Sequence, residues 1–138
     1  MAQEWICNNE EETANAAQEI AAILPYPCIV CLTGQLGAGK TAFSRALIRH
    51  LTNEPDLSVP SPTYTLVQMY DDENIWHFDL YRLDDANDIY DLGWEEALTA
   101  KICLIEWPIR LKSLKPKKTV DISIDVLPNE ARRIRINP

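Results

Sequence analysis

The chain has 138 residues, a length that suits one well-formed core, and we expect residues 1–138 to form a single domain. Hydrophobic residues make up 46% of it and charged residues 25%, as in ordinary soluble globular proteins. No apolar run approaches the roughly 18 residues of a membrane span, and the first residues lack the pattern of a secretory signal. We therefore expect a cytoplasmic protein that does not enter the membrane.

The formal net charge is −8, but the charge is unevenly spread. Residues 1–109 carry 5 basic and 18 acidic side chains, whereas residues 110–138 carry 8 basic and 3 acidic ones. An acidic body repels phosphate backbones, so we expect no independent binding of nucleic acid. The basic C-terminal stretch could face a nucleotide or an acidic partner, or it could be an ordinary solvated surface.

The first half of the chain has the pattern of a strand, a loop and a helix in succession. We expect a strand at residues 3–7 and a helix at residues 8–23, with an asparagine cap, acids in its first turn and Pro25 after its end. The apolar run 28–33 predicts a buried strand of a parallel sheet. A short glycine-rich loop then leads into a second helix at residues 40–51, which has one apolar face.

The second half of the chain adds more strands and short helical turns. Strands are expected at residues 64–70, 75–81, 101–105, 120–126 and 131–136, and helical turns at residues 86–92 and 94–100. The first two strands flank a polar turn and predict an antiparallel hairpin, and so do the last two. The sheet is therefore expected to be mixed.

The glycine-rich loop carries the clearest functional motif, because GQLGAGKT matches the Walker A pattern GxxxxGK[ST] in full. Glycines let consecutive backbone N–H groups point inward around phosphate oxygens, and the N-terminus of the following helix faces the same anion. Lys40 is expected to reach the β- and γ-phosphates and the Thr41 hydroxyl to bind Mg²⁺. The candidate nucleotide-binding residues of this segment are Gly34, Gln35, Leu36, Gly37, Ala38, Gly39, Lys40, Thr41 and Ala42.

The context of the motif agrees with this interpretation. Only four glycines occur in the chain and three of them lie in this loop, so a glycine-rich turn without a ligand explains the pattern poorly. We predict an α/β protein with a P-loop NTPase-like three-layer fold, a mixed, partly parallel β-sheet and an antiparallel C-terminal strand pair.

Two carboxylates are candidates for catalysis and magnesium binding. Glu106 directly follows an apolar strand, where an acid lies beside the phosphates and can hold Mg²⁺ through water or orient the attacking water; the alternative is a surface acid at a strand end. Asp79 lies among apolar and aromatic residues, where an unpaired carboxylate is costly. We expect Asp79 to coordinate Mg²⁺ directly or through water, and a salt bridge to Arg82 is the alternative.

Other polar and aromatic residues have two interpretations each. The hydroxyl-rich loop around Thr63 could be a nucleotide-sensing switch or a plain turn. Arg132 and Arg133 are candidates for neutralising phosphate charge or contacting the base. Trp107 could pack over the site or fill the core.

The spacing Cys28-x-x-Cys31 suggests a zinc or redox site, but we disfavour it. Both cysteines lie in an apolar run, no second CxxC pair occurs, and the two histidines are isolated in the sequence. Buried, reduced thiols explain these cysteines better.

Four segments, GQLGAGKT, SPTYTLV, HFDLYRL and LIEWP, follow one another at spacings that resemble the TsaE (YjeE) family over about residues 9–136. These are the P-loop ATPases of bacterial tRNA threonylcarbamoyladenosine (t6A) synthesis. The resemblance implies slow ATP hydrolysis and a partnership with the TsaD–TsaB heterodimer, which transfers a threonylcarbamoyl group to A37 of tRNAs that read ANN codons. In that scheme the ATP cycle of TsaE resets or supports TsaD between turnovers.

The same resemblance implies roles for individual residues. It implies phosphate and Mg²⁺ binding by Lys40 and Thr41, functional acids at Asp79 and Glu106, a switch residue at Thr63, an aromatic residue at Trp107, and a nucleotide contact from residues 9–13, including Thr13. The sequence departs from the family pattern at Ala42, where a second threonine is frequent, and at Gln35, where aspartate is common. Both changes leave the phosphate ligands intact.

The leading hypothesis is therefore a Mg²⁺-dependent ATPase that serves a tRNA-modification complex. A nucleotide-gated binding module, whose hydrolysis is incidental, is the second. A small-molecule kinase is disfavoured because its lid needs several arginines, and residues 55–100 contain one basic residue, Arg82. A GTPase is disfavoured because the sequence has no NKxD-type motif for reading guanine.

Overall fold

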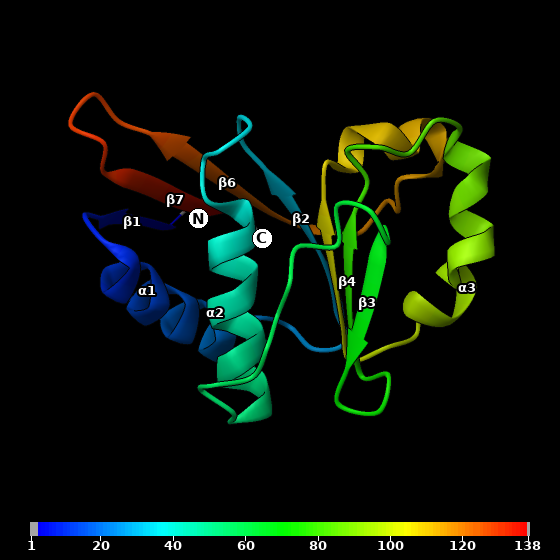
Figure 1. Ribbon diagram of the computed structural model, residues 1–138, viewed down its shortest axis with the longest axis horizontal. Helices are drawn as coiled ribbons and strands as arrows, with labels where there is room; N and C mark the ends of the chain where they lie inside the picture. The colour runs from blue at the N-terminus through cyan, green and yellow to red at the C-terminus, as the bar shows by residue number, and fades with distance from the viewer. Residues whose placement is uncertain (1–2, 138) are drawn as a thin grey trace.

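A computed structural model describes residues 3–137, which form a seven-stranded β-sheet with helices on both faces (Figure 1). The strands are β1 (Gln3–Cys7), β2 (Cys28–Thr33), β3 (Val67–Tyr70), β4 (Ile75–Asp79), β5 (Ile102–Glu106), β6 (Val120–Val126) and β7 (Arg132–Asn137). Their order across the sheet is β1-β7-β6-β2-β5-β4-β3. Strands β6, β2, β5 and β4 are parallel, whereas the pairs β1–β7, β6–β7 and β3–β4 are antiparallel.

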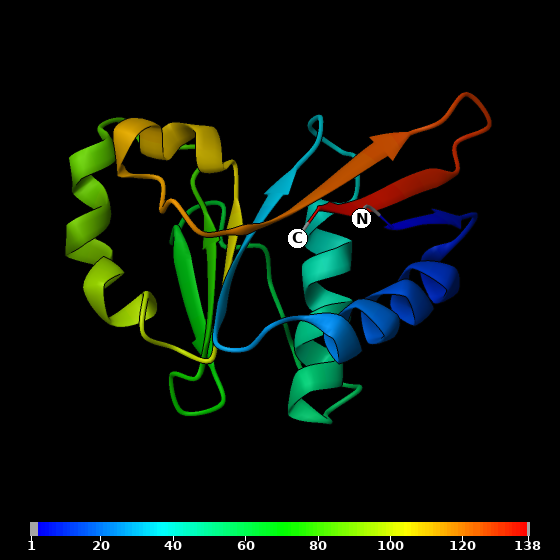
Figure 2. The same ribbon diagram turned by 180° about the vertical axis from the view of Figure 1, so that it is seen from behind.

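Helices cover the two faces of the sheet unequally, as Figure 2 shows from behind. The helical segments are α1 (Glu10–Ile23), α2 (Lys40–Thr52), α3 (Trp94–Ala97) and two 3-10 helices, η1 (Ala86–Leu92) and η2 (Pro108–Leu114). The long helices α1 and α2 pack on one face, and the short segments η1, α3 and η2 pack on the other. This confirms the predicted three-layer α/β fold. No helix within residues 3–137 combines the length and apolar character that a membrane crossing needs.

The first residues of α1 show how the local sequence determines where a helix begins. The Asn9 side chain accepts a hydrogen bond from the Glu12 backbone N–H at 2.9 Å, and Glu12 Oε1 accepts one from the Asn8 backbone N–H at 2.8 Å. This reciprocal arrangement satisfies amides that have no partner inside a helix. Acidic residues in the first turn also interact favourably with the helix dipole.

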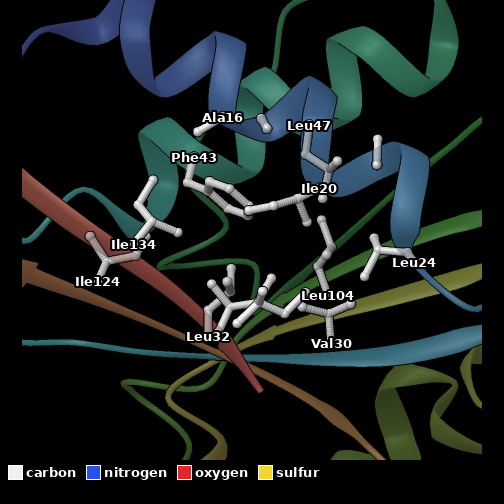
Figure 3. Close-up of a cluster of buried hydrophobic side chains, with 14 of the residues drawn as sticks. Ala16, Ile20, Leu24, Val30, Leu32, Phe43, Leu47, Leu104, Ile124 and Ile134 are labelled. Carbon is white, nitrogen blue, oxygen red and sulfur yellow. The ribbon is translucent and has the colours of Figure 1, made fainter. Parts of the chain in front are cut away.

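Each face of the sheet has its own apolar core. Along β2, Val30 and Leu32 point toward α1 and α2 and belong to the same apolar cluster as Phe43, as Figure 3 shows. Burial of side chains of this size stabilises a fold by about 1.5–3 kcal/mol each. Cys28 packs with the same core, whereas Cys31 faces the opposite one, so alternation along the strand separates the two thiols.

Some element boundaries differ from those expected. The hairpin strand predicted at residues 64–70 begins at Val67, because Leu66 has a φ of 70°, outside the strand conformation. Its partner ends at Asp79, whose side chain accepts a hydrogen bond from the Tyr81 N–H and closes a turn. The helical turn expected at residues 94–100 ends as an α-helix at Ala97, and η2 was not predicted.

Parallel pairing brings polar residues that are far apart in the sequence to one edge of the sheet. Asp79 and Leu32 are both Cα partners of Glu106 across their strands. The carboxyl ends of β2, β4 and β5 therefore meet at the same level, which is where α/β sheets usually bind ligands. The loop that follows β2 begins at this edge with Gly34.

Candidate functional site

A cavity of about 250 Å³ lies at the carboxyl edge of the parallel strands, beside the glycine-rich loop. Its lining comes from four separate stretches of the sequence: Leu36, Gly37, Gly39, Lys40, Thr41, Ala42, Ser61, Thr63, Asp79, Glu106 and Trp107. The structure thus brings most of the predicted phosphate-binding residues together with Thr63, both candidate carboxylates and Trp107.

The loop backbone has the conformation that its glycines allow. Gly37 has a φ of 81° and Gly39 a φ of 106°, both in the region that residues with a Cβ rarely adopt. Helix α2 starts immediately afterwards, and the amides of its first turn have no acceptor within the helix. Together with the helix dipole, these amides form a ready binding site for an anion.

Lys40 is buried at the start of α2, with an exposed fraction of 5%. Its Nζ donates hydrogen bonds to the backbone carbonyls of Gly34 at 2.6 Å and Gln35 at 2.9 Å. Burial lowers the pKa of Lys40, although the carboxylates of Glu106 and Asp79 act in the opposite direction. The ammonium is therefore held inside the loop, where burial makes its charged form less favourable than in water.

Trp107 covers Lys40 from the side of the cavity. The centre of its ring lies 4.2 Å from Lys40 Nζ and 4.9 Å from the centre of the Tyr81 ring. Its backbone is left-handed, with a φ of 59°, which is uncommon for a bulky residue and is typical of functional sites. Trp107 is also partly buried against the core under η1, α3 and η2, so the structure combines its two interpretations.

Glu106 is buried, with an exposed fraction of 2%, and its two carboxylate oxygens have different partners. Oε1 accepts a hydrogen bond from the Thr41 hydroxyl at 3.3 Å. Oε2 lies 2.6 Å from Nε2 of His77, a residue of β4. The alternative of a surface acid does not fit this position.

Asp79 is also buried and is hydrogen-bonded to the loop around Thr63, for which a switch and a plain turn were both open. Its Oδ2 accepts a hydrogen bond from the Thr63 hydroxyl at 3.3 Å, and that hydroxyl lies 2.6 Å from the hydroxyl of Ser61. Burial raises the pKa of Asp79, and the nearby Glu106 carboxylate raises it further, while the N–H of Tyr81 lowers it.

The alternative salt bridge from Asp79 to Arg82 does not form within the described residues 3–137. The Arg82 guanidinium instead lies 4.9 Å from the centre of the Tyr64 ring. Asp79 therefore lies in the cavity without a salt-bridge partner among residues 3–137.

A second cavity, of about 240 Å³, adjoins the first and shares Gly39 and Ala42 with it. Its lining is Cys7, Asn8, Asn9, Glu10, Thr13, Ala38, Gly39, Ala42, Ile124, Glu130, Arg132 and Ile134. The N-terminal segment around Thr13, for which the family resemblance implied a nucleotide contact, therefore lies next to the phosphate-binding loop. Arg132 is anchored there, because its Nε donates a hydrogen bond to the Ala38 carbonyl at 2.9 Å.

The two candidate arginines of β7 diverge in the structure. Arg133 lines neither cavity; its Nη2 lies 3.4 Å from Asp125 Oδ2 in the neighbouring strand β6. Successive residues of a strand point to opposite faces, so Arg132 and Arg133 cannot both reach the loop. The expectation of a nucleotide contact is therefore compatible with Arg132 and not with Arg133.

The family model described as "Threonylcarbamoyl adenosine biosynthesis protein TsaE" matches residues 7–134, nearly the whole chain. The chain belongs to the TsaE family. Relatives named tRNA threonylcarbamoyladenosine biosynthesis protein TsaE cover the same region. That of Rickettsia felis is 43% identical over 129 residues, 92% of this chain and 75% of the relative. That of Aquifex aeolicus is 35% identical over 136 residues, 97% of this chain and 95% of the relative.

A solved structure supports the TsaE assignment at the level of the fold. The crystal structure of Bacillus subtilis YdiB superposes on this chain with a TM-score of 0.76 at 26% sequence identity. The superposition covers 99% of this chain and 84% of the other. The superposition therefore includes the antiparallel strands at both edges of the sheet.

The cavity of this TsaE-family chain fits a magnesium ion that is shared with phosphates. Mg²⁺ in nucleotide sites takes one or two carboxylates and completes its shell with water and phosphate oxygens. The chain offers the Thr41 hydroxyl and the carboxylates of Asp79 and Glu106 around one cavity. Within residues 3–137 no three His, Cys, Asp or Glu side chains gather as a metal site by themselves. The phosphates of a nucleotide would therefore supply the missing ligands.

Two polar residues of the site were not predicted from the sequence. His77 contacts Glu106, and Ser61 contacts Thr63. For His77 a signal did exist, because it precedes Asp79 by two positions and so faces the same side of β4. Ser61 belongs to the hydroxyl-rich loop around Thr63 that was singled out from the sequence, although no role was predicted for Ser61 itself.

Proposed function

We propose that this chain binds ATP with Mg²⁺ and hydrolyses it slowly, as a cytoplasmic component of the machinery that makes t6A in tRNA. The observation that carries the proposal is the group formed by the buried Lys40 and Glu106 and the partly buried Thr41 under a Walker A loop. Relatives over most of the chain are named for t6A biosynthesis, which supports the same pathway here. In this pathway the partner would be the TsaD–TsaB heterodimer, with TsaD most directly involved.

The binding step follows from groups that already face the cavity. Lys40 would exchange the carbonyls of Gly34 and Gln35 for phosphate oxygens, which are stronger acceptors because they are charged. The first-turn amides of α2 would hold the same oxygens. Thr13 and Arg132 would lie beside the ribose and base, because the second cavity adjoins the phosphate loop.

The hydrolytic step would depend on the two carboxylates. Mg²⁺, when bound, neutralises and orients the phosphates. Thr41 would turn its hydroxyl oxygen from Glu106 to the metal, and Glu106 would then be free to orient the attacking water. Asp79 would hold the metal directly or through water, and the hydrogen bond from Thr63 to Asp79 would couple metal binding to the loop around Thr63.

A reconstituted assay tests the proposal. ATP turnover is measured with and without TsaD–TsaB, together with t6A formation over several cycles. We expect slow turnover of the isolated chain, a dependence on Mg²⁺, and loss of turnover in Glu106→Ala. Glu95→Ala, which removes an exposed acid on α3, is the matched control and should keep the wild-type rate. A wild-type chain that neither binds nor hydrolyses ATP would refute the proposal.

A nucleotide-gated binding module remains the second candidate, because Thr63 and Ser61 link the Asp79 carboxylate to an exposed loop. In that case ATP binding alone would order the partner surface. Multiple rounds of t6A formation with Glu106→Ala, despite its lost turnover, would favour the module over the ATPase.

A further inference from the structure

His77 is a completely buried polar residue of the sheet. Its exposed fraction is 0%, and it lies in β4, whose five residues are all buried. Buried polar side chains are costly unless they make hydrogen bonds, so a histidine at this position needs a physical reason. His77 itself is neither a predicted phosphate ligand nor a predicted metal ligand.

The contact of His77 with Glu106 arises from the register of two parallel strands. Asp79 is the Cα partner of Glu106, and His77 is the Cα partner of Leu104, two positions earlier on both strands. Ile75 and Leu104 belong to the core under α1 and α2, so His77 and Glu106 face that same side. The imidazole reaches along the strand, and its Nε2 lies 2.6 Å from Glu106 Oε2.

The second nitrogen of the imidazole indicates where the hydrogen lies. Nδ1 is buried and has no hydrogen-bond partner among the described residues. A buried N–H without an acceptor is more costly than a buried lone pair without a donor. We therefore assign the hydrogen to Nε2, from which His77 donates to the Glu106 carboxylate.

We propose that His77 is a positioning residue, which holds Glu106 in the orientation needed for hydrolysis; this inference rests on the ATPase function proposed above. Within residues 3–137, the hydrogen bonds to the Glu106 carboxylate come from Thr41 and His77. The bond from Thr41 is the longer one, 3.3 Å against 2.6 Å, and would be lost with Mg²⁺ bound to the Thr41 hydroxyl. The bond from His77 persists because β4 and β5 are paired.

This arrangement separates two tasks at the same carboxylate. His77 fixes Oε2 from inside the sheet, and Oε1 is left to face Thr41 and the cavity. Loss of a group that orients a ligand or catalytic side chain typically reduces activity or metal affinity ~10–100-fold. The phosphate loop makes no hydrogen bond to His77, so nucleotide binding in the absence of Mg²⁺ should be unaffected.

The test compares variants that keep or remove the donor. His77→Gln retains an N–H near the position of Nε2, whereas His77→Leu removes it at similar volume. We expect turnover to fall ~10–100-fold in His77→Leu and to recover to within about threefold of wild type in His77→Gln. The Kd for ADP in EDTA should stay within about threefold for both. Ile75→Val, on the same strand face, is a control for lost packing and should keep wild-type turnover.

Three results would overturn the inference while leaving the ATPase proposal intact. These are wild-type turnover in His77→Leu, equal losses in His77→Gln and His77→Leu, or a loss of the same size in Ile75→Val. If His77→Leu does not fold, His77→Asn replaces it, since its shorter amide does not reach Glu106 and should behave as donor-free. An inactive wild-type chain would instead reject the proposed function itself.

Discussion

Replacement of Lys40 by methionine should abolish most of the stabilisation that a nucleotide gives. Methionine keeps the apolar stem beside Trp107 and removes the ammonium, which donates two short hydrogen bonds to loop carbonyls. If both bonds are transferred to phosphate oxygens, at about 1.5 kcal/mol each, the variant loses about 3 kcal/mol of binding energy. This corresponds to a roughly 100-fold weaker affinity.

Thermal unfolding with and without Mg·ADP measures this loss. At ~100 times its Kd, a ligand stabilises the wild-type fold by about 2.7 kcal/mol, or roughly 10 °C for a chain of this size. The same concentration should stabilise Lys40→Met by about 0.4 kcal/mol, a shift below roughly 2 °C. Without nucleotide the variant should unfold near the wild-type temperature, because burial already disfavours the charged lysine.

Lys101→Met is the matched control, since this lysine is exposed and precedes β5 at the opposite end of the strand from Glu106. It should show the full wild-type shift. Equal shifts in Lys40→Met and wild type would show that the nucleotide binds elsewhere, and the reasoning about the loop would be wrong.

Three further predictions concern other residues of the structure. Asp79→Asn should abolish turnover yet raise the nucleotide-free Tm by a few degrees at neutral pH, because burial raises the pKa of Asp79 and so disfavours its charged form. This gain in Tm should shrink as the pH falls toward 3.8, the ordinary pKa of an aspartate, because the wild-type side chain then becomes neutral as well. Arg132→Ala should weaken Mg·ADP binding several-fold in calorimetry, whereas Arg133→Ala should not, and the reverse order would contradict the placement of the second cavity. Burial raises the pKa of Cys31 to about 11 and that of Cys103 further, so neither thiol should react with a maleimide at pH 7.5 before unfolding, as mass spectrometry can show.

The parts of the site that the sequence predicted are those set by local chemistry. The Walker A loop was recognisable because glycine, lysine and threonine must follow one another there to bind phosphate. Glu106 was recognisable because it ends an apolar strand, and the carboxyl end of a parallel strand lies at the edge of the sheet where ligands bind. The helix cap at Asn9 was equally local.

The features of the site that were not predicted depend on how elements far apart in the sequence pack together. Sequence could not choose between Arg132 and Arg133, because the choice depends on which face of β7 turns toward the loop. The pairing of His77 with Glu106 depends on the register of β4 and β5, which sequence patterns do not fix. Trp107 has a left-handed backbone, and its ring lies over Lys40. A tryptophan in the sequence gives no indication that its backbone will be left-handed.

A crystal structure with Mg·ADP would show directly whether the Walker A loop is the nucleotide site. We expect the β-phosphate within hydrogen-bond distance of Lys40 Nζ, the Thr41 hydroxyl oxygen on the metal, and the base in the cavity beside Arg132. A nucleotide bound away from this loop, or a Lys40 that keeps both of its carbonyl bonds when the nucleotide is present, would contradict it.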